Sequence, residues 1–212
     1  MEKVTVRVPA TSANLGPGFD CLGIALELFN TVSLERADRF QLLIAGEGSQ
    51  SLSKGMNNLV YKAVTSFYET VGVEPPPLSL ACHNEIPLSR GLGSSCAATV
   101  GGLVAANELN GKPLPQETLL KLAGDMEGHL DNAAPALLGG CQIVLKDGER
   151  VITSQVPLPM GLKAVLFIPA FPISTQKARQ VLPKEVSRSD AVFNLGRVAL
   201  LVNSLATGRL EN

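Results

Sequence analysis

IPLSRGLGSSCAA, residues Ile86–Ala98, stands between a predicted strand and a predicted helix. Its two glycines, Gly91 and Gly93, give access to backbone conformations that are closed to other residues, and they let the chain approach a ligand closely. A helix that begins here offers free N–H groups and a partial positive charge, which together bind phosphate. Ser94 and Ser95 add two hydroxyls, one to bond a phosphate oxygen and one to reach a Mg²⁺ ion. The pattern therefore predicts a phosphate-binding turn.

This turn differs from the P-loop of the common nucleotide hydrolases, because no Gly-Lys-Ser or Gly-Lys-Thr follows the glycines. A structural alternative stays open, in which the turn is an ordinary helix start with Ser94 as its N-cap. A glycine-rich turn taken alone favours that alternative. The functional interpretation therefore depends on what the rest of the chain carries.

Composition limits the classes of protein to which the chain can belong. Its 212 residues allow one large domain, or one domain and part of another, at roughly 100–200 residues each. Hydrophobic residues make up 45% and charged residues 17%, which suits a folded core. A net charge of −1 gives no electrostatic basis for binding nucleic acid or an anionic membrane. The longest apolar stretch, Leu162–Phe171, is too short to span a bilayer, and the alternating N-terminus is typical of a strand rather than a signal peptide, so we expect a cytoplasmic protein.

Cysteine and histidine are sparse in the chain. The cysteines are Cys21, Cys82, Cys96 and Cys141. None belongs to a C-x-x-C pair and each lies among apolar or small residues, so we predict four reduced, buried thiols. The two histidines are too few for a histidine-based metal site.

Hydrophobic periodicity and turn residues predict an α+β fold. Strands are expected over 4–8, 31–35, 40–44, 78–82, 141–145, 151–154 and 162–168, and helices over 57–70, 94–110, 115–127, 175–182 and 189–205. The segment Pro9–Asp20 is rich in proline, glycine, serine and asparagine and is expected to be a loop. This order favours helices packed on an antiparallel or mixed sheet. Pro157–Pro159 reads as a linker, which gives two domains, 1–156 and 157–212.

Two further segments combine polar side chains with glycine. PATSANLGPGFD (Pro9–Asp20) follows the first strand, and polar loops at strand ends are frequent ligand sites, although a surface turn is the alternative. EGHLDN (Glu127–Asn132) follows a predicted helix. As structural alternatives, Glu127 is a solvated residue at a helix end, and His129 is a capping or packing residue.

Taken together, these segments resemble one superfamily. The string Pro-x-x-x-Gly-Leu-Gly-Ser-Ser is similar to the phosphate motif of the GHMP kinases, which include galactokinase, homoserine kinase, mevalonate kinase and phosphomevalonate kinase, with Cys96 where alanine is usual. Pro9–Asp20 and Glu127–Gly140 resemble homoserine kinases in particular. The resemblance implies the GHMP-kinase fold, with an N-terminal ribosomal-S5-domain-2-like domain over 1–156 and the start of a ferredoxin-like C-terminal domain over 157–212.

The resemblance also implies an activity: transfer of the ATP γ-phosphate to the hydroxyl of L-homoserine, a step of threonine biosynthesis that uses ATP and Mg²⁺. The residues implied to bind the nucleotide are Asn58, Val60, Pro87, Leu88, Ser89, Arg90, Gly91, Leu92, Gly93, Ser94, Ser95 and Cys96. Those implied to bind homoserine are Asn14, Asp20, His129, Asp131, Asn132, Thr175 and Arg179. Ser95, Glu127, Thr175 and Arg179 are implied to be catalytic, with Ser95 and Glu127 also holding the metal.

Some of these assignments have equally simple alternatives. Asn58 also reads as the N-cap of a helix. STQKAR (Ser174–Arg179) puts Thr175 and Arg179 on one helix face, but a helix start with an exposed arginine explains it as well.

The function also has alternatives: another GHMP small-molecule kinase, or a non-catalytic remnant that binds nucleotide. Relatives are expected to continue past the equivalent of Asn212 with a third glycine-rich motif and a further substrate-binding arginine. We therefore expect a truncated second domain with an uncovered apolar face, and both an active and an inactive chain stay open. A homodimer is expected from the resemblance alone.

Overall fold

The computed structural model of the chain describes residues 2–168, 171 and 175–211, apart from the side chains of residues 175–177. Its centre is a six-stranded sheet in the order β3-β4-β2-β5-β6, with β1 paired to β2. The strands are β1 (Lys3–Leu15), β2 (Gly18–Arg36), β3 (Gln41–Gly46), β4 (Leu78–Asn84), β5 (Cys141–Asp147) and β6 (Arg150–Val156). These pairs are antiparallel except for β3 with β4, which is parallel. The mixed sheet agrees with the predicted α+β class.

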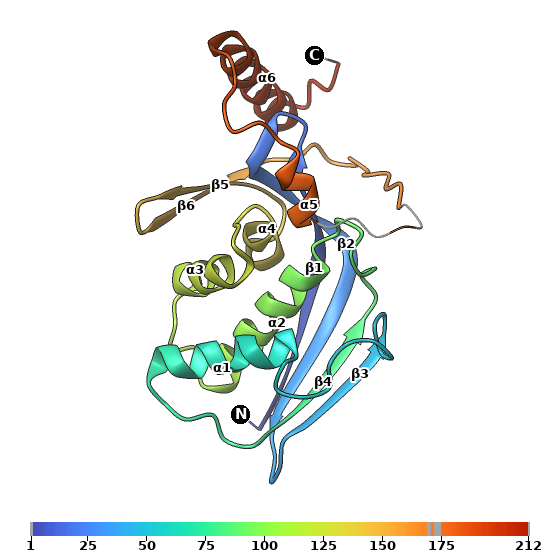
Figure 1. Ribbon diagram of the computed structural model, residues 1–212, viewed down its shortest axis with the longest axis vertical. Helices are drawn as coiled ribbons and strands as arrows, with labels where there is room; N and C mark the ends of the chain where they lie inside the picture. The colour runs from blue at the N-terminus through green and yellow to red at the C-terminus, as the bar shows by residue number, and fades with distance from the viewer. Residues whose placement is uncertain (1, 169–170, 172–174, 212) are drawn as a thin grey trace.

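Four helices lie against one face of this sheet (Figure 1). They are α1 (Leu59–Val71), α2 (Ser94–Leu109), α3 (Gln116–Glu127) and the short α4 (Ala133–Leu138). Apolar side chains from both layers form the main core, among them Leu34 and Leu80 from the sheet and Val64, Phe67 and Leu103 from the helices, all essentially buried. The first three helices match the sequence prediction within two residues at each end, whereas α4 was not predicted.

The segment Pro9–Asp20, predicted as a loop, is instead the tip of a long hairpin. Only two residues separate the end of β1 from the start of β2. The prediction was wrong because register shifts at Pro9/Ala10 and Ala13/Leu15 accommodate Pro9 within the ladder, so that only Gly16 and Pro17 remain in the turn. Bulges of this kind re-aim side chains, and Asn14 and Asp20 both take positive φ values, 58° and 57°. The hairpin therefore delivers polar side chains from strands rather than from a loop.

The part of the chain after β6 carries two helices, α5 (Thr175–Gln180) and α6 (Arg188–Thr207). Figure 1 shows α6 at the far end of the molecule from α1. The strand expected over 162–168 is wrong, because these residues are exposed and pair with no other strand among those described. A small apolar cluster joins this part to the sheet, in which Leu201, Val202 and Leu205 of α6 pack near the buried Leu22.

Exposed apolar side chains are frequent in this last part of the chain. The large ones from residue 160 onward are Met160, Leu162, Val165, Leu166, Phe167, Ile168, Phe171, Val181, Leu182, Val186, Val192, Phe193, Leu195, Leu200 and Leu210. In contrast, Ser204 is the single buried residue of α6. An uncovered apolar face was expected here, and the exposure of these side chains agrees with it.

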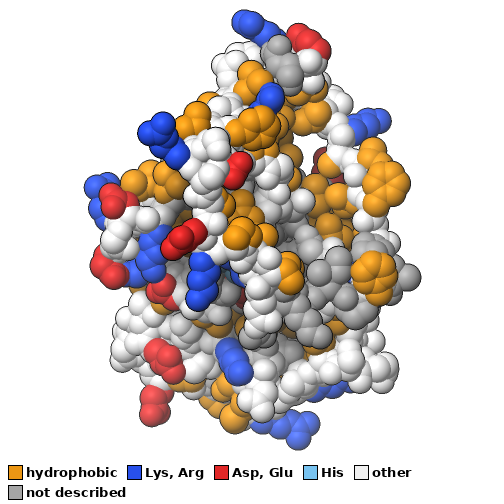
Figure 2. Space-filling view, turned by 45° about the horizontal axis from the view of Figure 1, so that its top comes forward, with side chains coloured by type: hydrophobic (Ala, Val, Ile, Leu, Met, Phe, Trp, Pro, Cys, Tyr) orange, Lys and Arg blue, Asp and Glu red, His pale blue; other side chains and the backbone are white. Residues whose placement is uncertain are grey.

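Charged side chains of both signs are interspersed on the face seen in Figure 2, with hydrophobic side chains more frequent in its upper half. This mixture suits the net charge of −1. Among the described residues, no helix is long and apolar enough to cross a membrane.

The four cysteines are free thiols, as predicted, but only three of them are buried, because Cys21 is partly exposed. Burial raises the pKa of Cys82 to about 11. The pKa of Cys96 is also raised, first by burial and then by the nearby carboxylates of Glu127 and Asp131. A thiol must be ionised to react, so these groups are chemically quiet in the folded chain.

We expect thiol labelling of the folded chain at pH 8 to be slow, because a group with the pKa of Cys82 is ionised in only about one molecule in a thousand at that pH. Labelling with a chromogenic disulfide reagent, followed by peptide mass spectrometry, should find Cys21 modified first and all four thiols modified after unfolding. Rapid modification of Cys82 in the folded chain, or fewer than four thiols in the unfolded one, would contradict this.

Candidate active site

One cavity of about 770 Å³ contains most of the predicted site residues. Its walls come from the hairpin tip, the start of α1, the turn before α2, the segment after α3, and α5. The predicted site residues that line it are Asn14, Asn58, Val60, Pro87, Leu88, Ser89, Arg90, Gly91, Leu92, Gly93, Ser94, Ser95, Cys96, His129, Asp131, Asn132 and Arg179. Every predicted nucleotide-binding residue is therefore on the wall of a single cavity of the size that suits a small molecule.

The turn before α2 places the helix N-terminus at this cavity. Gly93 is the N-cap of α2 in the left-handed conformation, with φ 65°, and its carbonyl accepts from the Ala97 N–H at 2.8 Å. Gly93 thus takes the cap position that the structural alternative had given to Ser94. The N–H groups of the first turn have no partner within the helix, which leaves them available to an anion. On the other side, the Thr11 N–H donates to the Leu92 carbonyl at 3.1 Å, which fixes the turn to β1.

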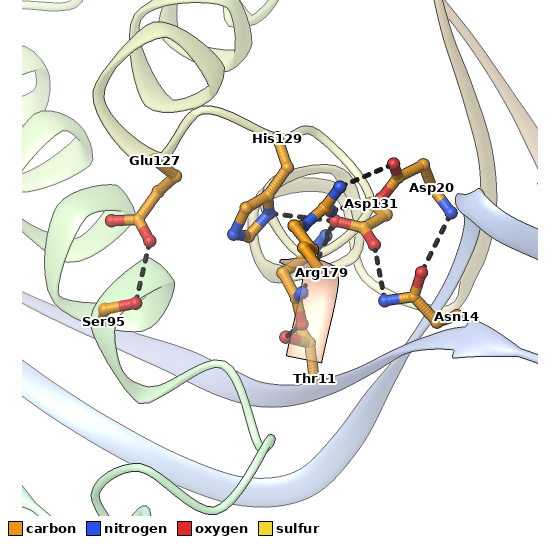
Figure 3. Close-up of polar contacts among 9 residues, drawn as sticks. Thr11, Asn14, Asp20, Ser95, Glu127, His129, Asp131 and Arg179 are labelled. Atoms are coloured by element: carbon orange, nitrogen blue, oxygen red, sulfur yellow. Dashed lines mark hydrogen bonds and ion pairs between the residues drawn. The ribbon is translucent and has the colours of Figure 1, made fainter. Parts of the chain in front are cut away.

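Glu127 meets Ser95 beside this helix start. It is the last residue of α3, which ends because Gly128 takes a left-handed conformation. The Ser95 hydroxyl donates to Glu127 Oε2 at 2.8 Å, and the Thr99 hydroxyl donates to Glu127 Oε1 at 2.6 Å. Figure 3 shows the Ser95–Glu127 pair on one side of the site.

The donor set of this pair fits a magnesium ion. Mg²⁺ prefers oxygen ligands and takes only one or two from the protein, the others being phosphate and water. A hydroxyl and a carboxylate within hydrogen-bonding distance of each other supply such oxygens. The described residues contain no group of three or more histidine, cysteine, aspartate or glutamate side chains placed to hold a metal.

A second cluster is centred on Asp131, whose side chain is 1% exposed. Asn14 Nδ2 donates to Asp131 Oδ2 at 3.1 Å, and the Asn132 N–H donates to Asp131 Oδ1 at 3.0 Å. His129 Nδ1 lies 2.9 Å from Asp131 Oδ1, although the ring N–H is not aligned for a hydrogen bond. The Thr11 hydroxyl donates to Asn132 Oδ1 at 2.6 Å and so ties the cluster to β1.

Asp131 and His129 each stabilise the charged form of the other. Burial acts to raise the pKa of Asp131, but the contact with His129 and the Asn132 N–H outweigh it, so the pKa is lowered and the carboxylate stays ionised. The pKa of His129 is raised, chiefly by its interaction with Asp131 and against the effect of burial. The pair therefore keeps an anion and a potential cation side by side at the cavity.

Asp20 and Arg179 form a bidentate ion pair at the rim of the site (Figure 3). Arg179 Nη1 donates to Asp20 Oδ2 at 2.8 Å, and Nη2 donates to the other carboxylate oxygen. The Asp20 N–H donates to Asn14 Oδ1 at 3.0 Å, which links this pair to the Asp131 cluster. Both charged side chains keep about two fifths of their surface exposed, so a charged ligand can reach them.

The remaining predicted residues are placed less directly. Asp20 and Glu127 are not on the cavity wall, but each is bonded to a residue that is. Asn58 is the N-cap of α1, accepting from the Val60 N–H, and it also donates to the Ser53 carbonyl at 2.7 Å, so its contact with a base stays a prediction. Ser174 lies outside the described residues, as does the side chain of Thr175.

Two residues of the site were not predicted from the sequence, Thr99 and Asn30. Thr99 holds Glu127, whereas Thr11, which lies in the predicted polar segment Pro9–Asp20, joins the phosphate turn to Asn132. Asn30, which is 2% exposed, accepts from the N–H groups at the start of that turn, Glu85 at 2.9 Å and Ile86 at 3.0 Å. No local sequence signal points to Thr99 or Asn30, since β2 also contains the polar residues Glu27, Thr31 and Ser33.

Comparison with known proteins gives the class first. Residues 58–140, which include the phosphate turn and the Glu127–Asn132 segment, match the family described as GHMP kinases N terminal domain. A crystal structure of a phosphomevalonate kinase from Streptococcus pneumoniae superposes with a TM-score of 0.73 at 15% identity, over all of this chain and 75% of the other, and so shares the fold. The fold is therefore that of the GHMP kinases.

The relatives then give the family. The homoserine kinase of Moorella thermoacetica is 49% identical over 206 residues, which are 97% of this chain and 70% of the relative. The crystal structure of homoserine kinase from Cytophaga hutchinsonii has a TM-score of 0.83 and 31% identity, and the match covers 98% of this chain and 69% of the other. The chain belongs to the homoserine kinase family.

Proposed function

We propose that the chain transfers the γ-phosphate of ATP to the side-chain hydroxyl of L-homoserine. The observation that carries the proposal is the single cavity, which has the phosphate turn on one side and the Asp131 cluster on the other. Phosphoryl transfer depends on holding donor and acceptor in line and on neutralising charge, rather than on covalent chemistry by the protein. A cavity that contains both kinds of site meets the first of these needs.

The substrate end of the cavity suits a zwitterion. Asp20 and Arg179 present opposite charges that are already matched to each other. The ammonium of L-homoserine would pair with Asp20 and its carboxylate with Arg179, so that two ion pairs replace one. Asn14, through its contacts with both Asp20 and Asp131, would hold this arrangement in place. Isoprenoid and sugar substrates lack the ammonium, and the relatives named above are homoserine kinases, so another GHMP activity is not favoured.

At the phosphate end, the first turn of α2 would bind the phosphates through its backbone N–H groups. Ser95 and Glu127 would hold a Mg²⁺ ion, which neutralises charge on the phosphate oxygens when it is bound. Thr175 and Arg179 stay predicted catalytic residues. The position of Arg179 supports its part of this prediction, since Arg179 reaches the cavity wall from α5. His129 and Asn132 would complete the wall next to the reacting hydroxyl.

The same proposal includes the predicted division of the chain. The elements that build the phosphate turn and the Asp131 cluster all lie before the end of β6 at Val156, which supports a nucleotide-binding domain over 1–156. The segment 157–212 would add Thr175 and Arg179. A homodimer stays a prediction from the family resemblance, and a cytoplasmic location stays a prediction from the sequence pattern.

The test is calorimetric titration of the purified chain with Mg²⁺–ATP and then L-homoserine, beside a coupled assay of ADP release and phosphorus NMR of the product. Binding of both ligands with formation of O-phospho-L-homoserine is the expected result. Binding of ATP without homoserine binding would instead indicate a nucleotide-binding remnant. Turnover with mevalonate or galactose in place of homoserine would overturn the substrate assignment.

We expect Asp20→Asn to raise the KM for L-homoserine by about tenfold, because it removes the charge that pairs with the ammonium and leaves Arg179 without its anionic partner. Nucleotide affinity should stay unchanged, since the hydrogen bonds of Asp20 are with Asn14 and Arg179 and not with the first turn of α2. Steady-state kinetics with each substrate varied in turn checks this. Asp38→Asn, which removes the same charge at an exposed turn, is the control. An unchanged KM for homoserine would remove Asp20 from the substrate site.

A further inference from the structure

Thr99 makes an unusual contact for a helical threonine. Its side chain lies one turn after Ser95 on α2 and is fully buried. The hydroxyls of Thr65, Thr70 and Thr207 each donate to a carbonyl of their own helix, four residues earlier. This bond is the ordinary choice of a helical threonine. The Thr99 hydroxyl instead donates to a carboxylate oxygen of Glu127, on α3, at 2.6 Å.

The position of Glu127 explains what this bond does. A carboxylate at the last residue of a helix faces the partial negative charge of the helix C-terminus, which is unfavourable for it. Two hydroxyl donors from α2 offset this repulsion, Ser95 on Oε2 and Thr99 on Oε1. Because Ser95 and Thr99 are four residues apart, they lie on one face of α2. They therefore hold both oxygens of the carboxylate at once and fix its orientation.

We propose that Thr99 is a positioning residue that orients Glu127 for the divalent cation. Thr99 takes the oxygen Oε1, which leaves Oε2 beside Ser95, and Ser95 lines the cavity. This inference rests on the proposed function, since it assigns Glu127 and Ser95 to Mg²⁺. It adds a residue that touches neither ligand and acts through Glu127.

The test uses Thr99→Val, which keeps the shape of the side chain and removes the hydroxyl. Binding of a fluorescent ATP analogue is measured as a function of Mg²⁺ concentration, with a parallel titration in chelator. We expect the Mg²⁺ concentration that gives half of the maximal change in nucleotide binding to rise by about tenfold. This is the lower end of what a hydrogen bond to a charged group contributes. Binding in chelator should not change, and Thr99→Ser should restore the Mg²⁺ dependence.

Two controls separate this role from a structural one. Thr65→Val removes a hydroxyl of the same kind on α1, bonded to the Tyr61 carbonyl, and should leave the Mg²⁺ dependence unchanged. In a Glu127→Gln background, Thr99→Val should have no further effect on it, because the residue acts through the carboxylate. If Thr99→Val does not fold, as judged by thermal unfolding, Thr99→Ala takes its place.

The outcomes distinguish the inference from the proposed function. A folded Thr99→Val chain with the wild-type Mg²⁺ dependence overturns the inference and leaves the kinase assignment standing. If Thr99→Val changes the Mg²⁺ dependence of nucleotide binding further in the Glu127→Gln background, the inference is also overturned, since Thr99 would then act by another route. A wild-type chain that binds nucleotide with no Mg²⁺ dependence overturns both the metal site and the role of Thr99.

Discussion

Gly93→Ala is expected to lower the free energy of unfolding by about 2–4 kcal/mol and to reduce nucleotide affinity by at least about tenfold. Gly93 has φ 65°, a conformation that costs an alanine about 1–2 kcal/mol. A Cβ at this position would also lie 2.0 Å from the Thr11 hydroxyl oxygen, so that the buried Thr11 must move and its bond to Asn132 is broken. Denaturant unfolding and nucleotide titration measure the two effects.

Gly91→Ala is the matched control for this variant. Gly91 has a similar φ of 71°, but a Cβ there would meet no protein atom within 4 Å. Its cost in stability should therefore be that of the backbone alone, about 1–2 kcal/mol. Adding Thr11→Ala to Gly93→Ala should recover part of the loss, because it removes the oxygen that the new methyl group meets. Equal destabilisation by the two glycine variants would show that the contact with Thr11 is unimportant.

Local signals in the sequence predicted the elements that position the phosphate turn. The helix that starts at Ser94 and the strand that precedes the turn were both predicted, since glycine, serine and apolar periodicity act over a few residues. The strands expected over 141–145 and 151–154 are likewise present as β5 and β6, and the structure pairs Asp147 with Arg150 across the turn between them. These features depend on neighbours along the chain, which is why the sequence alone specifies them.

The two segments that were predicted wrongly depend instead on strand pairing with distant parts of the chain. Pro9–Asp20 has the composition of a loop, yet long-range pairing with β2 extends the strand through it, and bulges accommodate the residues that locally disfavour a strand. Residues 162–168 have the composition of a strand, yet they are exposed and pair with no described strand. In both cases the presence or absence of a pairing partner, which no local pattern records, overrides the local preference.

The residues of the candidate site also fall into those that a local segment predicted and those that depend on distant partners. Glu127 and Asp131 were identified because they lie in a short segment that resembles homoserine kinases. Thr99 and Asn30 were missed, since their partners lie 28 residues away for Thr99 and 55 and 56 residues away for Asn30. Residues that hold other site residues in place depend on the folded arrangement of α2, α3 and β2, so only the structure brings them to notice.

Glu127→Gln is expected to lower kcat by about a hundred- to a thousandfold, a loss typical of removing one group that stabilises transition-state charge. The substitution keeps the size of the side chain and removes the charge that would hold Mg²⁺ beside Ser95. The amide also presents an N–H₂ group to one of the two hydroxyls that now donate, those of Ser95 and Thr99, so that this hydroxyl must accept instead. Coupled ADP-release kinetics over a range of Mg²⁺ concentrations measures the loss, and the KM for homoserine should change little.

Asp125→Asn separates this role from a general effect of charge. Asp125 lies two residues earlier on α3, and its side chain is 52% exposed and 3.7 Å from Lys146. Removing an exposed charge of this kind contributes little, so activity should stay within about twofold of the wild type. The two substitutions change the net charge equally and differ in whether the carboxylate faces Ser95. A similar loss of activity in both would therefore point to the overall field of the chain, whereas a loss confined to Glu127→Gln requires a local role at the phosphate end of the cavity.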